Sequence, residues 1–275
     1  MIYAISDIHG CLDAFEKRLA QISMDLEKKG NRLVLLGDYI DRGRDSYGVL
    51  NRVYSLQKQY GDEKVIALKG NHEVWFEDFL AGRGRDWLAE DNNYKTSATF
   101  LTMEQRAKQD RIPFRAAKIG YFVRTINANH RELLSWMNKL PCYYETATQI
   151  FVHAGVDEQI PEEEMEYCTL GTPEYVLTGK YPPTIGKFYK DIIAGHVAAR
   201  EVVNYARHVE DWVGQGIFYD GYSHYYIDGS VEYTGNLLCL AYDEEQGKYY
   251  ELKSDERLAL IKNPVRDEEM RRSSG

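Results

Sequence analysis

The sequence lacks the features of membrane-spanning, secreted and nucleic-acid-binding proteins. No apolar run reaches the length that spans a bilayer, and the start MIYAISDIHG has no basic region followed by a long apolar stretch. The four cysteines form no CxxC pair, so we expect reduced thiols and no disulfide framework: Cys11, Cys142, Cys168 and Cys239. A net charge of −9 and an isoelectric point near 5.4 argue against general binding to nucleic acids or anionic membranes. Together these absences predict a soluble, cytoplasmic protein.

The chain does contain enough apolar material for a large core. Of its 275 residues, 44% are hydrophobic and 13% are aromatic. Neither an internal repeat nor a low-complexity linker divides the sequence. We therefore expect one domain over residues 1–260, followed by a charged, frayed tail over residues 261–275.

The first third of the chain alternates between strand and helix patterns. Short apolar runs with strand character are each followed by a segment whose apolar residues recur at helical spacing. This order predicts a parallel sheet with right-handed crossovers, and hence an α/β fold. The expected strands are residues 2–6, 33–36 and 65–68, and the expected helices are residues 11–28, 46–60 and a segment that begins near residue 73.

The remainder of the chain changes character twice. Residues 82–140 are polar and poor in strand signals, which predicts a helical excursion with helices near 103–111 and 130–139. After further strands near 143–153 and a loop-rich stretch over 155–190, the chain becomes β-rich from 225 to 252. We expect its last two strands, 237–242 and 248–252, to form a meander that ends a second sheet.

Residues that bind hard or borderline metals follow several of the buried strands. The candidates are Asp7, His9, Asp38, Asn71, His153 and His196. Carboxylate, imidazole and amide oxygen at the carboxyl ends of strands are suited to a two-metal site, and Asp38 is placed to bridge two ions. Asn71 is also a standard helix N-cap, so it can serve either role or both. The pattern favours a metal-dependent hydrolase that acts on phosphate.

Three further residues near these candidates suit phosphate chemistry. Arg42 offers a bidentate fork for two phosphate oxygens. His72 is a candidate general acid, with Asp41 as the carboxylate that orients it. By contrast, the remaining histidines lack this context, and we expect them to be structural or exposed: His130, His208 and His224.

Five motifs in this order give the chain a family resemblance. They are SDIHG at 6–10, GDYIDRG at 37–43, GNHE at 70–73, FVHAG at 151–155 and GH at 195–196. Over about residues 2–245 the chain resembles the calcineurin-like metallophosphoesterases, and within them the phosphoprotein phosphatase group. That group includes bacterial and phage Ser/Thr phosphatases and symmetrical diadenosine tetraphosphatases.

The resemblance implies a four-layer α/β/β/α sandwich with two mixed sheets and assigns roles by position. Asp7 and His9 would bind one metal, Asn71, His153 and His196 the other, and Asp38 both. Arg42 would hold phosphate oxygens, while His72 paired with Asp41 would protonate the leaving group. Two divalent ions are implied, manganese first, with iron or zinc as alternatives; the mixed N/O ligands suit them better than magnesium alone.

One departure from the family pattern affects substrate choice. The family usually has a second phosphate-binding arginine between the two late histidines, and residues 154–195 contain none. Lys180, Lys187 or Arg200 are the candidates to replace it. The expected substrate is a phosphorylated protein or peptide, as for a Ser/Thr phosphatase, with a dinucleoside tetraphosphate as the alternative. A non-catalytic module that binds phosphate or a partner is the alternative from another class.

Overall fold

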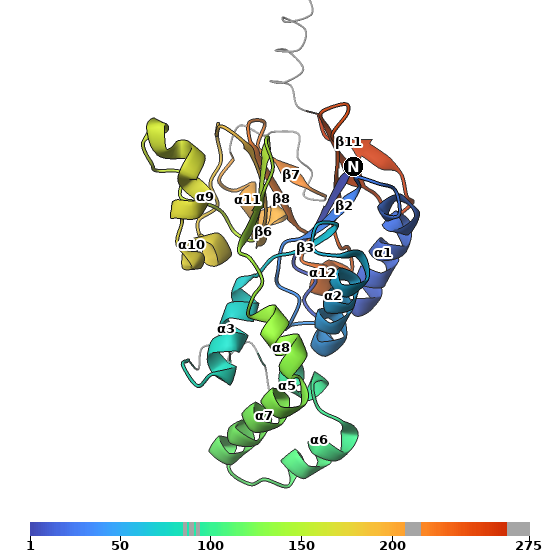
Figure 1. Ribbon diagram of the computed structural model, residues 1–275, viewed down its shortest axis with the longest axis vertical. Coiled ribbons are helices and arrows are strands. Elements are labelled where there is room, and N and C mark those ends of the chain that lie inside the picture. Colours follow the sequence, from blue (N-terminus) through green and yellow to red (C-terminus); the bar gives the residue numbers. More distant parts are fainter. Residues whose placement is uncertain (85–86, 88–90, 92–93, 207–215, 263–275) are drawn as a thin grey trace, which may run out of the picture.

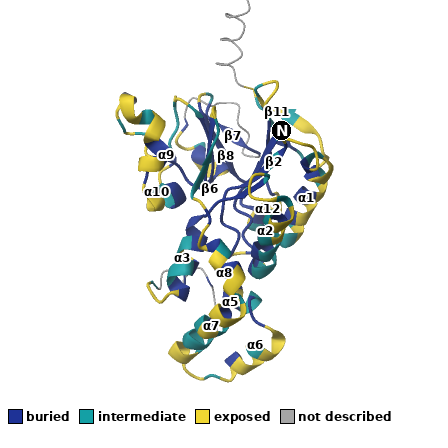
Figure 2. Ribbon diagram, in the orientation of Figure 1, coloured by how far each residue is buried: buried dark blue, intermediate teal, exposed yellow. Residues whose placement is uncertain are grey.

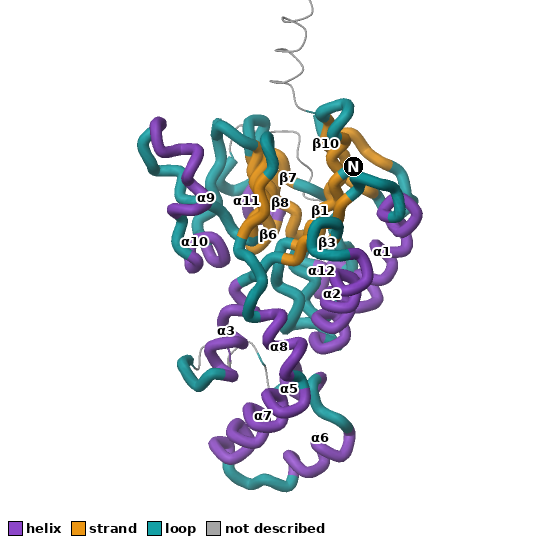
Figure 3. The backbone as a smooth tube through the Cα atoms, viewed as in Figure 1, coloured by secondary structure: helices purple, strands orange, loops and turns teal. Residues whose placement is uncertain are grey.

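Two β-sheets packed face to face, with helices on both outer sides, form the body of the protein (Figures 1 and 3). The computed structural model describes residues 1–84, 87, 91, 94–206 and 216–262. Its strands are β1 (Ile2–Ile5), β2 (Arg32–Leu35), β3 (Val65–Ala67), β4 (Tyr143–Glu145), β5 (Gln149–Val152), β6 (Asp191–Ala198), β7 (Phe218–Tyr219), β8 (His224–Asp228), β9 (Leu240–Asp243), β10 (Lys248–Leu252) and β11 (Leu258–Leu260).

The helices include the three predicted in the first third of the chain. Asn71 begins α3, two residues earlier than expected, because its backbone is already helical. The helices are α1 (Leu12–Leu26), α2 (Ser46–Tyr60), α3 (Asn71–Leu80), α5 (Lys95–Thr99), α6 (Met103–Asp110), α7 (Arg115–Asn129), α8 (Arg131–Met137), α9 (Cys168–Gly171), α10 (Glu174–Gly179), α11 (Ala199–Val202) and α12 (Val231–Thr234), with a 3₁₀ turn at Glu162–Tyr167.

The first sheet has the strand order β11-β10-β9-β1-β2-β3. Strands β1, β2 and β3 are parallel, as their helical crossovers require. The predicted meander of β9 and β10 exists, but it extends this sheet and not the second one, because β9 pairs antiparallel with β1. The alternation of apolar and polar residues identifies a strand but not the strand that pairs with it. The assignment of the meander to the second sheet was therefore wrong.

The second sheet has the order β4-β5-β6-β8-β7. Its central strands β5, β6 and β8 are parallel, so their carboxyl ends meet at one edge. Strand β6 departs from regular register against β8 between Ala194 and Ala198. A bulge of this kind re-aims the side chains within it, and His196 lies there.

Alternation along the strands builds the layers. In β1, Ile2 and Ala4 belong to the apolar cluster between the two sheets, whereas Tyr3 and Ile5 belong to the cluster beneath α1 and α2. A third cluster lies on the outer side of the second sheet, against α10 and α11. The three clusters separate four layers, which confirms the predicted α/β/β/α sandwich.

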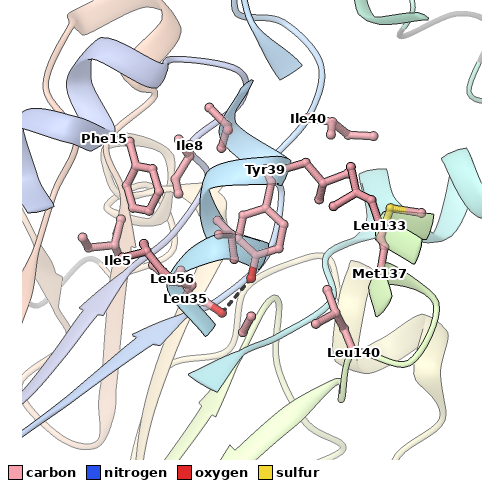
Figure 4. Close-up of a cluster of buried hydrophobic side chains, with 14 of the residues drawn as sticks. Ile5, Ile8, Phe15, Leu35, Tyr39, Ile40, Leu56, Leu133, Met137 and Leu140 are labelled. Carbon is pink, nitrogen blue, oxygen red and sulfur yellow. Dashed lines mark hydrogen bonds between the residues drawn. The ribbon is translucent and has the colours of Figure 1, made fainter. Parts of the chain in front are cut away.

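Tyr39 lies at the centre of the cluster on the helical side of the first sheet, among Ile5, Phe15 and Met137 (Figure 4). Its hydroxyl has hydrogen-bond contacts with the carbonyl oxygens of Leu35 (3.1 Å) and Leu68 (2.7 Å). This buried tyrosine therefore links the ends of β2 and β3 directly below the turns that carry the site. It fixes these turns by packing and by hydrogen bonding together.

The predicted helical excursion is present, with more helix than expected. Helices α6 and α8 match their predicted ranges, whereas α7 was not predicted. Only Phe122 and Ile126 of α7 are fully buried, so its apolar stripe is too narrow to stand out in sequence. Figure 2 shows α6 and much of α7 exposed, in contrast to the buried strands. Within the described ranges, no helix combines the length and apolarity needed to cross a membrane.

Candidate active site and metal centre

All six predicted metal ligands converge where the two sheets meet at their carboxyl edges. Five of them are buried, and only His196 is partly exposed. The first sheet supplies four through the segments after its strands: Asp7, His9, Asp38 and Asn71. The second sheet supplies His153 directly after β5 and His196 from the bulge of β6.

The backbone at these positions adopts an unusual conformation. Asp7, His9, Asp38 and His196 have φ values of 52°, 44°, 55° and 62°, a region that residues other than glycine rarely enter. The turns are held by hydrogen bonds from the Asp7 N–H to the Gly37 carbonyl (3.2 Å) and from the His9 N–H to the Asp38 carbonyl (2.9 Å). Such strain is characteristic of functional sites, where surrounding structure enforces it.

One half of the centre contains His9 between two carboxylates. Its Nδ1 lies 2.8 Å from the carbonyl of Ile40 and must donate to it, so Nε2 carries the free lone pair. Nε2 lies 3.9 Å from Asp7 Oδ1 and 3.6 Å from Asp38 Oδ2, and it has no hydrogen-bond partner in the described part of the chain. Burial lowers the His9 pKa to about 3. A neutral imidazole beside two carboxylates is suited to bind a cation.

The other half joins both sheets through Asp38. His153 Nε2 lies 3.0 Å from Asn71 Oδ1 and 3.4 Å from Asp38 Oδ1, and its Nδ1 lies 3.0 Å from the Leu36 carbonyl. The ring of His196 stands edge-on to that of His153, with 5.2 Å between centroids. Burial and the neighbouring His153 lower the His196 pKa to about 4. Asn71 therefore uses its side chain toward His153, while Gly70 is the N-cap residue of α3.

Asp38 connects the two halves. Among the described residues, two groups could hold a metal ion, and within each group the ligand atoms lie within 4.8 Å of one another. Both groups include Asp38: one is His9, Asp38 and His72, and the other is Asp38, His153 and His196. Although burial opposes ionisation, His153 and His72 hold the Asp38 pKa well below its usual range. An ionised carboxylate shared by two clusters is the arrangement of a bridging ligand. The first set contains His72 in place of Asp7, whose Oδ2 accepts a hydrogen bond from the His196 N–H at 3.0 Å.

His72 is paired as predicted. Its Nδ1 lies 2.6 Å from Asp41 Oδ2, and its Nε2 lies 3.7 Å from Asp38 Oδ2. Burial opposes the charged ring, but Asp38 and the hydrogen bond to Asp41 raise the His72 pKa to about 9. The imidazole therefore carries a donatable proton at neutral pH, and its Nε2 faces the carboxylate of Asp38.

Two residues that support the His72–Asp41 pair and the neighbouring turn were not recognised in the sequence. Trp87 is buried and donates its indole N–H to both oxygens of Asp41, at 3.2 and 2.9 Å. Glu73 is buried and accepts the backbone N–H groups of Asp38, Tyr39 and Gly70, at 2.9, 2.9 and 3.0 Å. Glu73 could have been suspected from its place in GNHE, whereas a tryptophan in a polar stretch gives no such signal.

Arg42 lies at the open side of the centre. Its side chain is 40% exposed, and Nη1 pairs with Glu232 Oε1 at 3.1 Å. The three candidates for the missing arginine are less suited. Lys180 Nζ is held by the Val156 carbonyl (2.6 Å) and Glu158 (2.8 Å), so this lysine is not free to bind phosphate. Lys187 is exposed, and Arg200 lines a separate cavity of about 240 Å³ with Asp228 and Ser230.

The other histidines are structural where they are described. His130 Nε2 lies 2.8 Å from the Phe100 carbonyl. His224 lies buried on β8, between Asp220 (3.0 Å) and Glu158 (3.1 Å). His208 lies outside the described residues.

Comparison with known proteins agrees with this geometry. The sequence pattern described as calcineurin-like phosphoesterase matches residues 1–216, so the chain belongs to this family of metal-dependent phosphoesterases. In Nitrosococcus oceani, a symmetrical bis(5'-nucleosyl)-tetraphosphatase is 28% identical over 169 residues, 61% of this chain and 48% of that protein. In Serratia proteamaculans, a protein of the same name is 26% identical over 192 residues, 69% of this chain and 55% of that protein.

The chain thus spans about half the length of these curated relatives. Among solved structures, a cold-active protein-tyrosine phosphatase of a psychrophilic Shewanella species superposes with a TM-score of 0.54 and 16% identity, covering 95% of this chain and 80% of that one. The similarity to this phosphatase structure supports the fold alone.

Proposed function

We propose that the protein hydrolyses phosphoric esters and anhydrides by direct attack of water, without a covalent enzyme intermediate. One observation carries the proposal: Asp38 is shared by two clusters of metal-binding atoms, beside a buried His72–Asp41 pair. This arrangement supports a role for Asp38 as bridging ligand and for His72 as proton donor, which are the two requirements of such hydrolysis.

The residues present fit a pair of divalent cations. The free lone pair of His9 Nε2 and the ionised Asp38 are donors for them, with Asp7 on one side and Asn71, His153 and His196 on the other. When bound, such ions lower the pKa of water toward neutrality and offset phosphate charge. Manganese is our first choice, because imidazole and carboxylate ligands occur together.

The remaining steps belong to side chains of this protein. Arg42 binds equatorial oxygens of the phosphoryl group, where charge spreads in the transition state. His72 donates the proton on Nε2 to the departing oxygen, and Asp41 keeps its Nδ1–H oriented. Trp87 holds both oxygens of Asp41 and so fixes the direction of this relay.

Two substrate classes are compatible with this centre: phosphorylated Ser or Thr side chains, and dinucleoside tetraphosphates. The names of the relatives from Nitrosococcus oceani and Serratia proteamaculans favour the second class. We therefore place a dinucleoside tetraphosphate ahead of a phosphopeptide, in the reverse of the order suggested by the motifs.

The test compares p-nitrophenyl phosphate, a phosphoserine peptide and diadenosine tetraphosphate, each with metal-stripped enzyme and after addition of manganese. We expect turnover of p-nitrophenyl phosphate that depends on added metal, and a higher kcat/KM for the tetraphosphate than for the peptide. Lack of any metal-dependent turnover would instead identify a binding module that kept the fold.

A further inference from the structure

A carboxylate with little solvent exposure contacts the arginine that we expect to bind phosphate. Glu232, on α12, places Oε1 3.1 Å from Nη1 of Arg42, and its side chain is only 5% exposed. The other oxygen, Oε2, is buried and has no hydrogen-bond partner among the described residues. The two residues are 190 positions apart in the sequence, so the packed fold and not a local turn brings them together. Arg42 therefore has a negative charge beside it before any substrate binds.

The position of Arg42 is fixed at its backbone as well as at its side chain. Lys95 Nζ bonds the carbonyl oxygen of Arg42, and the N–H of the following Gly43 donates to the His9 carbonyl at 2.8 Å. Although burial opposes the charged form, the carboxylates of Asp38, Glu232 and Asp7 together raise the pKa of Arg42. The guanidinium thus lies within the electrostatic reach of both Glu232 and the catalytic carboxylates.

The planar guanidinium sets the distance between Glu232 and a bound phosphate. With Nη1 bonded to Glu232, a phosphoryl group must use the remaining N–H donors of the rigid fork. Two anions on different edges of one guanidinium lie roughly 7 Å apart. This separation is shorter than the screening length of about 8 Å at physiological ionic strength, so Glu232 would repel negative charge on the phosphoryl group.

The other charged groups around Arg42 act on this position less directly. A cavity of about 460 Å³ beside Arg42 is lined by charges of both signs, most of them exposed, and solvent weakens their effect. Besides Arg42 and Glu232, these charged residues are Lys17, Arg44, Lys95, Asp13 and Asp45. Asp228 is a further buried carboxylate near Arg42, but burial and the charge of Asp7 raise its pKa well above the usual range. Glu232 differs from all of these because it is barely exposed and contacts the same guanidinium as the phosphate.

The second phosphate-binding arginine of the family pattern is also missing. Residues 154–195 contain no arginine, and Lys180 is held by the Val156 carbonyl and by Glu158. The cation assigned to phosphate is therefore Arg42, and Glu232 offsets its charge. Both observations reduce the positive charge that the side chains offer to a highly charged phosphoryl group.

Substrates differ in how much charge their reacting phosphorus carries. A phosphomonoester is close to a dianion at pH 8, because its second pKa is about 6. A phosphodiester, or an internal phosphate of an anhydride chain, carries a single negative charge at the same pH. The repulsion from Glu232 acts on each of these charges, so it disfavours the phosphomonoester more than the diester.

We propose that Glu232 is a specificity-determining residue, which favours substrates whose reacting phosphoryl group carries one negative charge over phosphomonoesters. The inference rests on the proposed hydrolysis and specifies its substrate by charge on phosphorus. It applies equally to simple diesters that contain neither a nucleoside nor a further phosphate. Arg42 binds the phosphoryl oxygens, and Glu232 limits how much negative charge they carry.

The test is the variant Glu232→Gln, which keeps an oxygen acceptor for Arg42 Nη1 but removes the charge. The substrates are p-nitrophenyl phosphate and bis(p-nitrophenyl) phosphate, which share a leaving group, assayed at pH 8 with manganese. We expect kcat/KM for the monoester to rise about tenfold, and that for the diester to change by less than about twofold. Because the ratio of the two values cancels the fraction of folded enzyme, partial misfolding of the variant cannot hide the effect.

A matched control separates the local charge from the loss of any glutamate. Glu16→Gln removes a carboxylate that also pairs with an arginine, Arg52, at 2.7 Å, but lies outside the cavity lining. It should leave the substrate ratio unchanged. In 1 M salt the screening length falls to about 3 Å, so the ratios of wild type and Glu232→Gln should converge to within about twofold.

Inhibition by molecules that are not turned over gives a second measure. Inorganic phosphate is largely a dianion at pH 8, whereas dimethyl phosphate is a monoanion. Phosphate should inhibit Glu232→Gln at about tenfold lower concentration than the wild type, because the repulsion is gone. Dimethyl phosphate should inhibit both proteins equally.

The outcomes separate this inference from the proposed function. If the wild type turns over neither ester with metal present, the hydrolysis itself fails. If Glu232→Gln speeds both esters equally, Glu232 only blocks Arg42; if it slows both equally, Glu232 only positions Arg42. Either result, or an unchanged ratio, would overturn selection by charge while the hydrolysis stands.

Discussion

Two clusters of histidine and carboxylate stand out among the described residues, and His9 in one uses its ring nitrogens differently from His224 in the other. In the catalytic cluster, His9 Nε2 faces Asp7 and Asp38 at distances too long for hydrogen bonds and has no partner in the described structure. In the second, which we call the anchor cluster (His224, Asp220, Glu158 and Lys180), both nitrogens of His224 lie 3.0–3.1 Å from carboxylate oxygens.

The electrostatics follow the same division. Burial lowers the pKa of His9 to about 3, whereas in the anchor cluster the bonds to Asp220 and Glu158 outweigh burial and raise the pKa of His224 to about 9. His9 is neutral, so its Nε2 lone pair is available to bind a cation. His224 is protonated, and the carboxylates of Asp220 and Glu158 balance its charge. A buried histidine nitrogen without a partner thus indicates a ligand site. Paired nitrogens do not exclude one, because both nitrogens of the candidate ligand His153 have partners.

The largest effect should come from the residue that joins the halves of the catalytic cluster. We expect Asp38→Asn to lower kcat for p-nitrophenyl phosphate by about 10³-fold or more, because the neutral amide weakens metal binding and the stabilisation of transition-state charge. Metal content, measured by mass spectrometry, should fall as well. Normal turnover by this variant would show that Asp38 does not bridge.

A smaller effect is expected for the proton donor. His72→Asn should slow phenyl phosphate by about 10²-fold and p-nitrophenyl phosphate less, since the poorer leaving group depends more on protonation. Metal content should stay close to that of the wild type. Equal slowing of both substrates would remove His72 from its role as acid.

The indole that orients Asp41 should matter less again. Trp87→Phe keeps the aromatic packing against Phe76 and Phe79 but removes the N–H donated to Asp41. We expect kcat to fall about tenfold for phenyl phosphate with KM little changed, and to fall less for p-nitrophenyl phosphate. A drop in thermal stability with unaltered kcat would mean that Trp87 only packs.

The anchor cluster should affect stability and not catalysis. His224→Gln should lower the free energy of unfolding by about 3 kcal/mol below pH 6.5. This loss is expected because folding raises the pKa of His224 from 6.5 to about 9, and the variant has no such group. Because the folded-state pKa is the higher one, this contribution is full below pH 6.5 and disappears as pH rises through 9. Urea titrations at pH 6 and pH 10 measure the difference, which should be smaller at pH 10. Activity of the folded variant should stay near that of the wild type.

The sequence was sufficient to locate those candidate site residues that come soon after an apolar strand. Asp7, Asp38 and His153 each come soon after an apolar strand, so the sequence predicted that they meet at a sheet edge. Their distances agree, because Asp7 and Asp38 both face His9 and His153 lies 3.4 Å from Asp38. The roles of these side chains stay predictions until metal binding is measured. So does the single domain over residues 1–260.

Long-range features were beyond the sequence. No local sequence pattern indicated that β9 would pair with β1, that Trp87 would hydrogen-bond to Asp41, or that Lys180 would form an ion pair with Glu158. Each of these contacts joins residues more than twenty positions apart. Their partners are selected by the packed fold and not by neighbouring residues.

The split origin of the ligands has a thermodynamic consequence. Asp38 comes from the first sheet and His153 from the second, so a cation bound by both would hold the two sheets of the sandwich together. Since the unfolded chain cannot present these ligands together, every tenfold rise in free ion above the dissociation constant adds about 1.4 kcal/mol to the free energy of unfolding. The melting temperature of this enzyme should therefore report the metal supply of its surroundings, even in a variant that has lost all turnover.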